Sequence, residues 1–345
     1  MGNLILRKIF TLTSLGFLTA LAFTPIFINF LTKNKFGKQI RNDGSTPLYS
    51  KLHNGKAGTP IMGGVLVWGT LAAIMLVFWF FDRVLHISAF SGLDFYSRKE
   101  TLLPLGALLG ASLVGLLDDW LDMKQLGHKG RGLRFRFKFI LYAVVAMIGA
   151  WWFYYKLGFA SVHVPFYGPW HMGVWFLPFF ILAVISTSFA VNETDGLDGL
   201  AGGILLWAFF AFGLIAFLQG KYDLASFIGV ICGALLAFLW FNVHPAKIFM
   251  TDTGSMGLGV LLAVVAFLTN SIFLLALIGF IFLLEAVSVL LQLFWKKYFK
   301  KKLFLSAPIH HHLQALGWPE AQITMRFWII ASVMSIIGVI IYFLG

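Results

Sequence analysis

The sequence predicts an all-α integral membrane protein with about ten transmembrane helices. Hydrophobic residues make up 59% of the 345 residues, and only 12% are charged. A soluble domain carries about 25% charged residues, so this chain has too little charge to cover a water-facing surface. Its 38 Phe and 12 Trp also suit a chain packed against lipid. We therefore expect residues 1–345 to form a single polytopic membrane domain.

Ten apolar stretches account for the expected spans, at roughly 20 residues for each crossing. The N-terminal stretch has no small-residue cleavage site before Pro25, so it is interpreted as a retained first span. Segment 154–173 is rich in Gly, Pro and aromatic residues, which indicates a small hairpin or an interfacial segment. The expected spans cover residues 11–31, 61–81, 101–117, 138–153, 174–191, 200–218, 224–241, 255–269, 272–295 and 327–344.

The distribution of basic residues predicts the orientation of these spans. Segments 32–60, 118–137, 192–199, 242–254 and 296–326 would lie on one side of the membrane. With Lys138 counted at the edge of this set, they hold 19 of the 26 Lys and Arg residues. The remaining 7 lie on the other side. The side with the excess of Lys and Arg faces the cytoplasm. Both termini are therefore expected on the periplasmic side.

Acidic residues and histidines concentrate on the same predicted cytoplasmic side. This side holds nine of the 14 carboxylates and six of the 9 histidines: Asp43, Asp118, Asp119, Asp122, Glu193, Asp195, Asp198, Asp252 and Glu320, with His53, His128, His244, His310, His311 and His312. The clustering indicates a site at this face. The net charge of +12 is explained by topology and an anionic substrate or lipid headgroup, so no nucleic-acid partner is expected. Cys232 is the single cysteine, which excludes an internal disulfide and a multi-cysteine metal site.

Three carboxylates at span ends are candidate ligands or catalysts. Asp118 and Asp119 repel each other at a membrane boundary, so a cation or water must offset the cost. The pair is either a solvated helix end or a metal ligand with a catalytic base. Asp252, among Thr and Ser neighbours, suits a hard cation with oxygen ligands. It suits the N-cap of the following helix equally well.

The segment Asn192–Gly199 packs polar residues and glycines between two apolar spans. Asp195 and Asp198 would share a face if the segment were helical. The glycines let a backbone approach a ligand, and a glycine-rich turn that opens a helix can donate N–H groups to phosphate. The alternative is an ordinary turn with an Asp cap.

Histidine and basic clusters complete the set of candidates. The run His310–His312 is either a surface cluster or adventitious metal site, or a group that contacts phosphate and assists proton transfer. Zinc is less well supported, because adjacent histidines seldom point at one metal and cysteine ligands are missing. Basic residues next to the acidic segments suit a multiply anionic substrate, although each is also a topology signal: Lys56, Lys129, Arg131, Arg134, Arg136 and Lys138. Together these features predict a carboxylate site for Mg²⁺ that performs phosphoryl transfer.

Six segments in this order resemble a known family. They are KAGTPIMGG from residue 56, LLDDW from 116, NETDGLDGLAGG from 192, FNVHPAKIFMTDTGS from 241, APIHHHLQALGWPE from 307 and RFWII from 326. The ordered set resembles the phospho-N-acetylmuramoyl-pentapeptide transferases of bacterial peptidoglycan synthesis. The resemblance implies a ten-span inner-membrane enzyme, often dimeric, with its active site open to the cytoplasm. It implies Mg²⁺-dependent transfer of phospho-N-acetylmuramoyl-pentapeptide from its UDP carrier to undecaprenyl phosphate, which releases UMP and forms lipid I.

The resemblance also implies roles for individual residues. Asp118 and Asp119 match the acidic pair that includes the base, and Asp252 matches the metal-binding aspartate, with Asp118 as its expected partner. His311 is expected to be catalytic. Phe249 matches an aromatic residue that stacks on uracil, and Glu285 matches a further family position. The other expected substrate contacts are Lys56, Thr59, Lys138, Asn192, Asp195, Gly196, Asp198, Gln292, His310 and His312.

The sequence departs from the family pattern at four positions. Asp122 stands where the family usually has Lys, and Lys124 follows two residues later. Phe189 replaces the usual Asn, Glu193 the usual Leu and Thr251 the usual Gly. These changes bear on donor binding more than on the metal chemistry.

Three other classes of function are weighed against this one. A sister enzyme that transfers N-acetylglucosamine-1-phosphate would share the acidic core, but PIHHH and GWPE favour the muramoyl donor. A transporter would place charges at the membrane midplane, often in inverted repeats. Here only Glu285 is expected to lie deep in a span, and no repeat is visible. An intramembrane protease or zinc hydrolase would need an HExxH or GxSxG element, which this sequence lacks.

Overall fold

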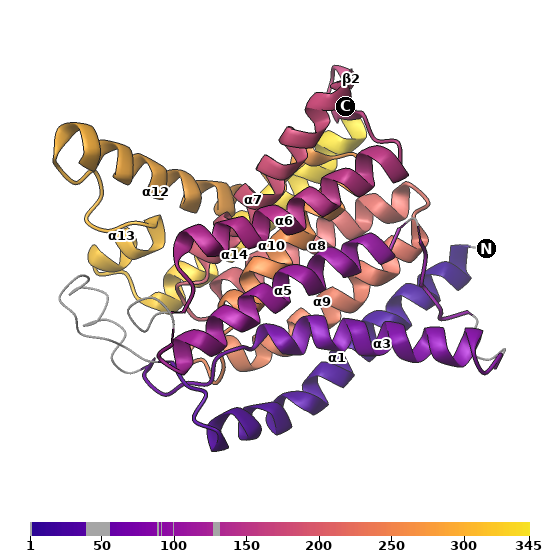
Figure 1. Ribbon diagram of the computed structural model, residues 1–345, viewed down its shortest axis with the longest axis horizontal. Helices are drawn as coiled ribbons and strands as arrows, with labels where there is room; N and C mark the ends of the chain where they lie inside the picture. The colour runs from indigo at the N-terminus through magenta and orange to yellow at the C-terminus, as the bar shows by residue number, and fades with distance from the viewer. Residues whose placement is uncertain (1, 39–55, 88–89, 91, 99, 127–131) are drawn as a thin grey trace.

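The computed structural model describes residues 2–38, 56–87, 90, 92–98, 100–126 and 132–345. Most of its long helices lie side by side in one bundle, with the N-terminal end at the right of Figure 1 and the C-terminal end at the top beside β2. Nine helices of the described residues have the length and composition of a membrane span, or ten if one bent pair counts as a span. The predicted all-α membrane class is therefore confirmed. Asp43, His53, His128, Lys129 and Arg131 lie outside the described residues.

The helices of the described residues follow the predicted apolar stretches closely. The long ones are α1 (Gly2–Lys33), α3 (Gly64–Arg83), α5 (Leu102–Met123), α6 (Phe135–Trp151), α7 (Phe176–Thr194), α8 (Leu200–Leu218), α9 (Tyr222–Asn242), α10 (Thr251–Leu268), α12 (Phe280–Phe299) and α14 (Glu320–Leu344). A π-helical turn, Trp152–Lys156, extends α6, and two short helices, α11 (Leu275–Ile278) and α13 (Ile309–Ala315), flank α12.

Helix α10 forms the centre of the bundle. It contacts α3, α5, α7 and α8, and its residues from 253 to 268 are all buried. A helix that is apolar on every side is stable only when other helices surround it. Glycine lets the neighbours come close: a Cβ on Gly115 of α5 would overlap the carbonyl of Asp252. This approach places the end of α5 against the start of α10.

The predicted span 272–295 is interrupted. Helices α11 and α12 meet at Gly279 with a bend of 83°. Glycine is a poor helix former, so the helical axis can break there at little cost. As a result α12 and α13 extend away from the bundle, on the left of Figure 1. The histidine run therefore reaches the bundle from the side.

A two-stranded hairpin precedes α7. Strands β1 (Ser161–Val164) and β2 (Gly168–His171) pair antiparallel, with Ser161 opposite His171. Of the two alternatives for segment 154–173, a small hairpin or an interfacial segment, the structure shows the hairpin. The hairpin lies at the end of the bundle where α7 begins and α10 finishes.

Candidate functional site

The candidate residues meet at the opposite end of the bundle from the hairpin. Asp118 and Asp119 lie in the last turns of α5, and Asn192 lies in the last turn of α7. Lys138 lies in the first turns of α6, and Asp252 in the first turn of α10. Antiparallel neighbours bring helix ends and helix starts together. The topology alone therefore gathers these five side chains.

Asp118 and Asp252 share one cation. The Lys138 ammonium lies 2.8 Å from Asp118 Oδ2 and also bonds Asp252 Oδ2. Asp252 Oδ1 accepts a hydrogen bond of 2.7 Å from the amide of Asn192. The backbone N–H of Leu133 donates to Asp118 Oδ1 at 2.7 Å. The Asp252 carboxylate thus contacts residues of α6 and α7 and does not cap the N-terminus of α10. These contacts favour the interpretation of Asp252 as a ligand over its interpretation as an N-cap.

Asp119 is held by a separate set of donors. Its Oδ2 accepts from the hydroxyls of Thr251 at 2.6 Å and Thr253 at 2.5 Å, and from the N–H of Thr253 at 3.0 Å. The N–H of Met62 donates to the Thr251 hydroxyl at 3.1 Å. Thr251 has φ of +55°, where a β-branched residue is strained. The hydroxyl contacts of Thr251 hold it there and explain how this chain uses Thr where the family usually has Gly.

The loop between α7 and α8 carries two carboxylates with different environments. Its residues form turns, so Asp195 and Asp198 do not share a helix face. Asp195 accepts the N–H of Thr251 at 2.9 Å, and burial of its carboxyl group raises its pKa to about 7. The N–H groups of Asp198 and Gly199 donate to Glu320 and Asn242. These two N–H groups are therefore occupied within the protein.

Asp198 belongs to an ion-pair network with Lys56 at its centre. The Lys56 ammonium lies 2.7 Å from Asp198 Oδ1 and 2.5 Å from Glu320 Oε1. His244 Nδ1 lies 3.0 Å from Asp198 Oδ2, and the N–H of Ala246 donates to the same oxygen at 3.1 Å. Burial raises the pKa of Asp198, but its hydrogen bond and ion pair with Lys56 outweigh that effect and lower the pKa overall. Asp198, His244 and Glu320 also offer ligand atoms close enough together to hold a metal ion, and the Lys56 ammonium contacts two of these three residues.

A cavity of about 300 Å³ opens between these groups. The Phe249 ring lines it, with the Lys38 ammonium 4.7 Å and the Lys56 ammonium 5.8 Å from the ring centre. A flat aromatic face beside cations suits a planar base that carries phosphates. The lining residues are Lys38, Asp118, Asp119, Asp122, Asn192, Asp195, Gly196, Leu197, Phe249, Thr251 and Asp252.

The remaining predicted residues lie around this cavity at different distances from it. The backbone carbonyl of Thr59 accepts a hydrogen bond of 2.9 Å from the backbone N–H of Lys38. His311 Nδ1 lies 2.8 Å from Gln314 Oε1, and His312 Nδ1 accepts from the N–H of Leu305. The Gln292 amide binds the backbone of the loop after α12: Leu303 and Phe304. The structure thus gives His312 and Gln292 a part in holding this loop.

His310 is the member of the histidine run that turns inward. It is fully buried, and its Nδ1 lies 3.0 Å from Glu285 Oε2. Its other ring nitrogen lies against Gly196, a residue of the cavity wall.

The four departures from the family pattern fall in distinct places. Asp122 lines the cavity, whereas Lys124 is exposed and absent from the described lining. Phe189 packs against Phe135, Phe139 and Tyr142. Glu193 is exposed near the end of α7. The Lys38 ammonium, rather than Lys124, brings positive charge to the wall that contains Asp122.

Sequence reasoning did not identify several residues of this site. Lys38 carried no motif signal, although it lines the cavity. Thr253, His244 and Glu320 lay within the quoted motif segments but were given no role of their own, although Thr253 binds Asp119 and the other two contact Asp198 or its backbone. Tyr142 lies one helical turn after Lys138, and its buried hydroxyl has no hydrogen-bond partner among the described residues.

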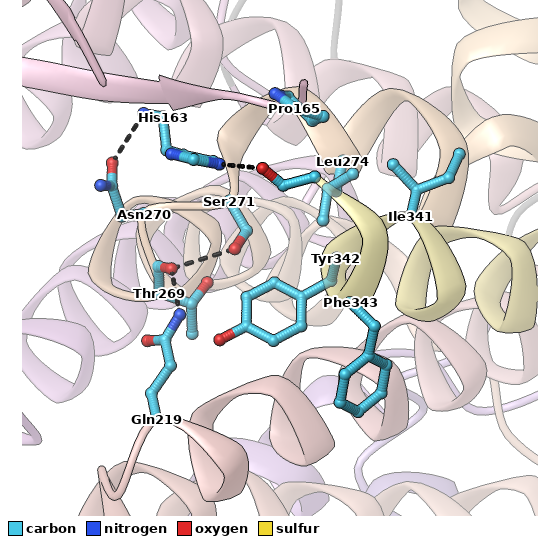
Figure 2. A pocket seen from close by; sticks show the side chains of 11 residues that line it. His163, Pro165, Gln219, Thr269, Asn270, Ser271, Leu274, Ile341, Tyr342 and Phe343 are labelled. Carbon is cyan, nitrogen blue, oxygen red and sulfur yellow. Dashed lines mark hydrogen bonds between the residues drawn. The ribbon is translucent and has the colours of Figure 1, made fainter. Parts of the chain in front are cut away.

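A second cavity lies at the hairpin end of the bundle. It measures about 430 Å³, and Figure 2 shows its side chains, among them His163, Gln219, Asn270 and Tyr342. The His163 N–H donates to Asn270 at 3.1 Å, and the Gln219 amide donates to the carbonyl of Thr269 at 2.7 Å. Its described lining contains no Asp, Glu, Lys or Arg. This cavity therefore lacks the charged side chains that line the acidic cavity.

The acidic cavity contains carboxylate oxygens of the kind that bind Mg²⁺ in proteins. Asp118 and Asp252 offer carboxylate oxygens, and the Lys138 ammonium between them shows that one positive charge can be held by both. The argument for a metal site here rests on the nearby carboxylate oxygens of Asp118 and Asp252 and on the side-chain amide of Asn192, which bonds Asp252.

Comparisons with known proteins agree with this geometry. Residues 101–270 match the model of glycosyl transferase family 4. The chain is 36% identical over 341 residues to a phospho-N-acetylmuramoyl-pentapeptide-transferase of Chloroflexus aggregans, covering 95% of this chain and 88% of the relative. The chain belongs to this transferase family. Phospho-N-acetylmuramoyl-pentapeptide-transferases of Geobacillus thermodenitrificans and Listeria monocytogenes are each 38% identical, over 95% and 94% of this chain and 96% and 95% of theirs.

Proposed function

We propose that this chain transfers phospho-N-acetylmuramoyl-pentapeptide from UDP to undecaprenyl phosphate, releasing UMP and forming lipid I. The observation that carries the proposal is the acidic cavity, where Asp118, Asp119 and Asp252 meet Lys138 and the Phe249 ring. The family and the names of its relatives support the same reaction.

Different residues of the cavity have different proposed roles in the reaction. Asp118 and Asp252 would hold Mg²⁺, which when bound neutralises the charge of the diphosphate. Phe249 would stack on uracil, while Lys38 and Lys56 face the anionic part of the donor. Lys138 balances the charge of the two metal-binding carboxylates.

Asp119 is the base that we propose for the lipid phosphate. Its Oδ2 is occupied by three donors, which fixes the carboxylate in one orientation. Its Oδ1 accepts no hydrogen bond from the described residues, so it is the oxygen left to take a proton. The deprotonated lipid phosphate then attacks the β-phosphorus of the donor, and UMP leaves.

The orientation in the membrane belongs to this proposal. With the excess of Lys and Arg on the side of the acidic cavity, that cavity faces the cytoplasm, and both termini face the periplasm. The UDP-linked donor would enter from the cytoplasm and the polyprenyl acceptor from the bilayer. We also propose an inner-membrane location and a homodimer, in line with the family.

A donor-choice assay tests the reaction. The purified protein in detergent would receive undecaprenyl phosphate and Mg²⁺ with either UDP-N-acetylmuramoyl-pentapeptide or UDP-N-acetylglucosamine, and UMP would be measured. UMP release with the muramoyl donor alone is the expected result. Release only with the N-acetylglucosamine donor would assign the chain to the sister activity, and release with neither would contradict the proposed function.

A further inference from the structure

Glu285 and His310 form a hydrogen-bonded pair that the proposed mechanism does not use. Glu285 lies on α12 and His310 in the first turn of α13. Both side chains are 0% exposed, and Glu285 Oε2 lies 3.0 Å from His310 Nδ1. A fully buried carboxylate requires a compensating donor, and His310 is its partner among the described residues. The pairing places the proton of the imidazole on Nδ1, because a carboxylate only accepts.

The other nitrogen of His310 is buried without a partner. Nε2 makes no hydrogen bond with the described residues, and neither does Glu285 Oε1. A buried ring nitrogen that lacks a partner marks a position where a ligand atom or a proton is expected.

Nε2 is directed at the wall of the acidic cavity. A Cβ built on Gly196 would overlap Nε2 and would lie 2.9 Å from Cε1 of the same ring. Gly196 lines the cavity next to Asp195. The imidazole therefore lies directly behind the cavity wall and fills the space that a side chain at 196 would need.

We propose that Glu285 is a positioning residue for His310. By accepting Nδ1–H, it holds the ring so that Nε2, the acceptor nitrogen of the neutral ring, faces the Gly196 wall and takes a hydrogen bond from a hydroxyl or amide N–H of the bound donor. This inference rests on the proposed function, since the donor supplies the hydrogen-bond partner. Glu285 acts through His310 and does not itself touch the substrate.

A double-mutant cycle on UMP release tests the proposal. Glu285→Gln keeps the shape of the side chain and removes its charge, and it is expected to lower kcat about 10- to 100-fold. The Glu285→Gln/His310→Ala protein should be no less active than His310→Ala alone, because the glutamate acts only through the ring. Glu285→Asp, which restores the carboxylate, should recover part of the lost kcat.

Controls separate this proposal from the proposed function and from misfolding. Glu100→Gln alters a partly buried carboxylate at the hairpin end, which accepts the N–H of Leu224, and should leave UMP release unchanged. Thermal unfolding in detergent would show whether each variant folds. Full activity of Glu285→Gln, or effects of the two substitutions that simply multiply, would overturn the positioning role. No UMP release by the wild-type protein would instead contradict the proposed function.

Discussion

The two ends of the bundle hold cavities of similar size and opposite chemistry. The cavity at the hairpin end, of about 430 Å³, is lined by neutral polar and aromatic groups that mostly bond to backbone (Figure 2). The cavity at the other end, of about 300 Å³, is lined by five Asp residues and Lys38. The two ends of α10 contribute to different cavities: Thr251 and Asp252 line the acidic one, and Thr269 lines the other. The difference shows that the chemistry follows from the residues at the helix ends rather than from the bundle itself.

The largest expected effect is a loss of kcat on substitution at the acidic end of the bundle, compared with a matched substitution at the hairpin end. Asp252→Ala removes a proposed metal ligand and leaves Lys138 and Asn192 without their shared partner. We expect kcat for UMP release to fall at least about 1,000-fold. The matched change Asn270→Ala at the hairpin end should alter kcat less than about twofold. Near-normal turnover by Asp252→Ala would contradict the proposal that Asp252 binds a metal at this end of the bundle.

Lys138→Met is expected to reduce stability and activity together. The substitution leaves Asp118 and Asp252 facing each other without their cation, and breaking a buried ion pair costs about 3 kcal/mol. Thermal unfolding followed with and without Mg²⁺ is the measurement. Mg²⁺ should raise the unfolding temperature of Lys138→Met more than that of the wild-type protein, because the metal replaces the lost charge. An equal rise in both proteins would argue against Mg²⁺ binding between these carboxylates.

Changes at the aromatic wall should affect donor binding more than the chemical step. Phe249→Ala removes the ring over which Lys38 lies at 4.7 Å. We expect KM for the UDP-linked donor to rise about tenfold, with kcat changed less than about threefold. Steady-state kinetics with varied donor would check this, and Phe189→Leu, outside the described lining, is the control. A fall in kcat with unchanged KM would place the ring elsewhere in the mechanism.

The smallest expected effect concerns Thr251. Replacing it by Gly relieves a positive φ but removes the hydroxyl that binds Asp119, and each contribution is about 1 kcal/mol. The two contributions oppose each other, so Thr251→Gly should unfold within a few degrees of the wild-type protein. Thr251→Ala loses the hydroxyl and keeps the strain, so it should be the less stable of the two. Equal unfolding temperatures for Gly and Ala would show that φ at this position has no cost.

The sequence was informative where topology alone decides the outcome. Alternating spans put the ends of α5 and α7 beside the start of α10, so Asp118, Asn192 and Asp252 meet once the helices are in place. The composition of segment 154–173 indicated a hairpin or an interfacial segment, and the structure shows the hairpin. The interruption at Gly279 did not, because a single glycine is tolerated inside many helices.

Contacts between distant loops could not be predicted from one sequence. Lys56 pairs with Glu320 across 264 positions, and no local pattern indicates this partner. The contacts of the Gln292 amide with the backbone of residues 303–304 were also not indicated by the sequence, and its expected contact with substrate stays a prediction. Only the fold shows that His310 faces Glu285 and Gly196 while its two neighbours point elsewhere. The roles of the individual site residues remain predictions that the substitutions above test.

The most direct test of the account is UMP release by the wild-type protein in Mg²⁺ and in EDTA. The reaction would contain UDP-N-acetylmuramoyl-pentapeptide and undecaprenyl phosphate, and Mg²⁺ would be restored after chelation. The account predicts steady release in Mg²⁺, none in EDTA and recovery when Mg²⁺ returns. Release that continues unchanged in EDTA would contradict the claim that the carboxylates of the acidic cavity act through a divalent cation.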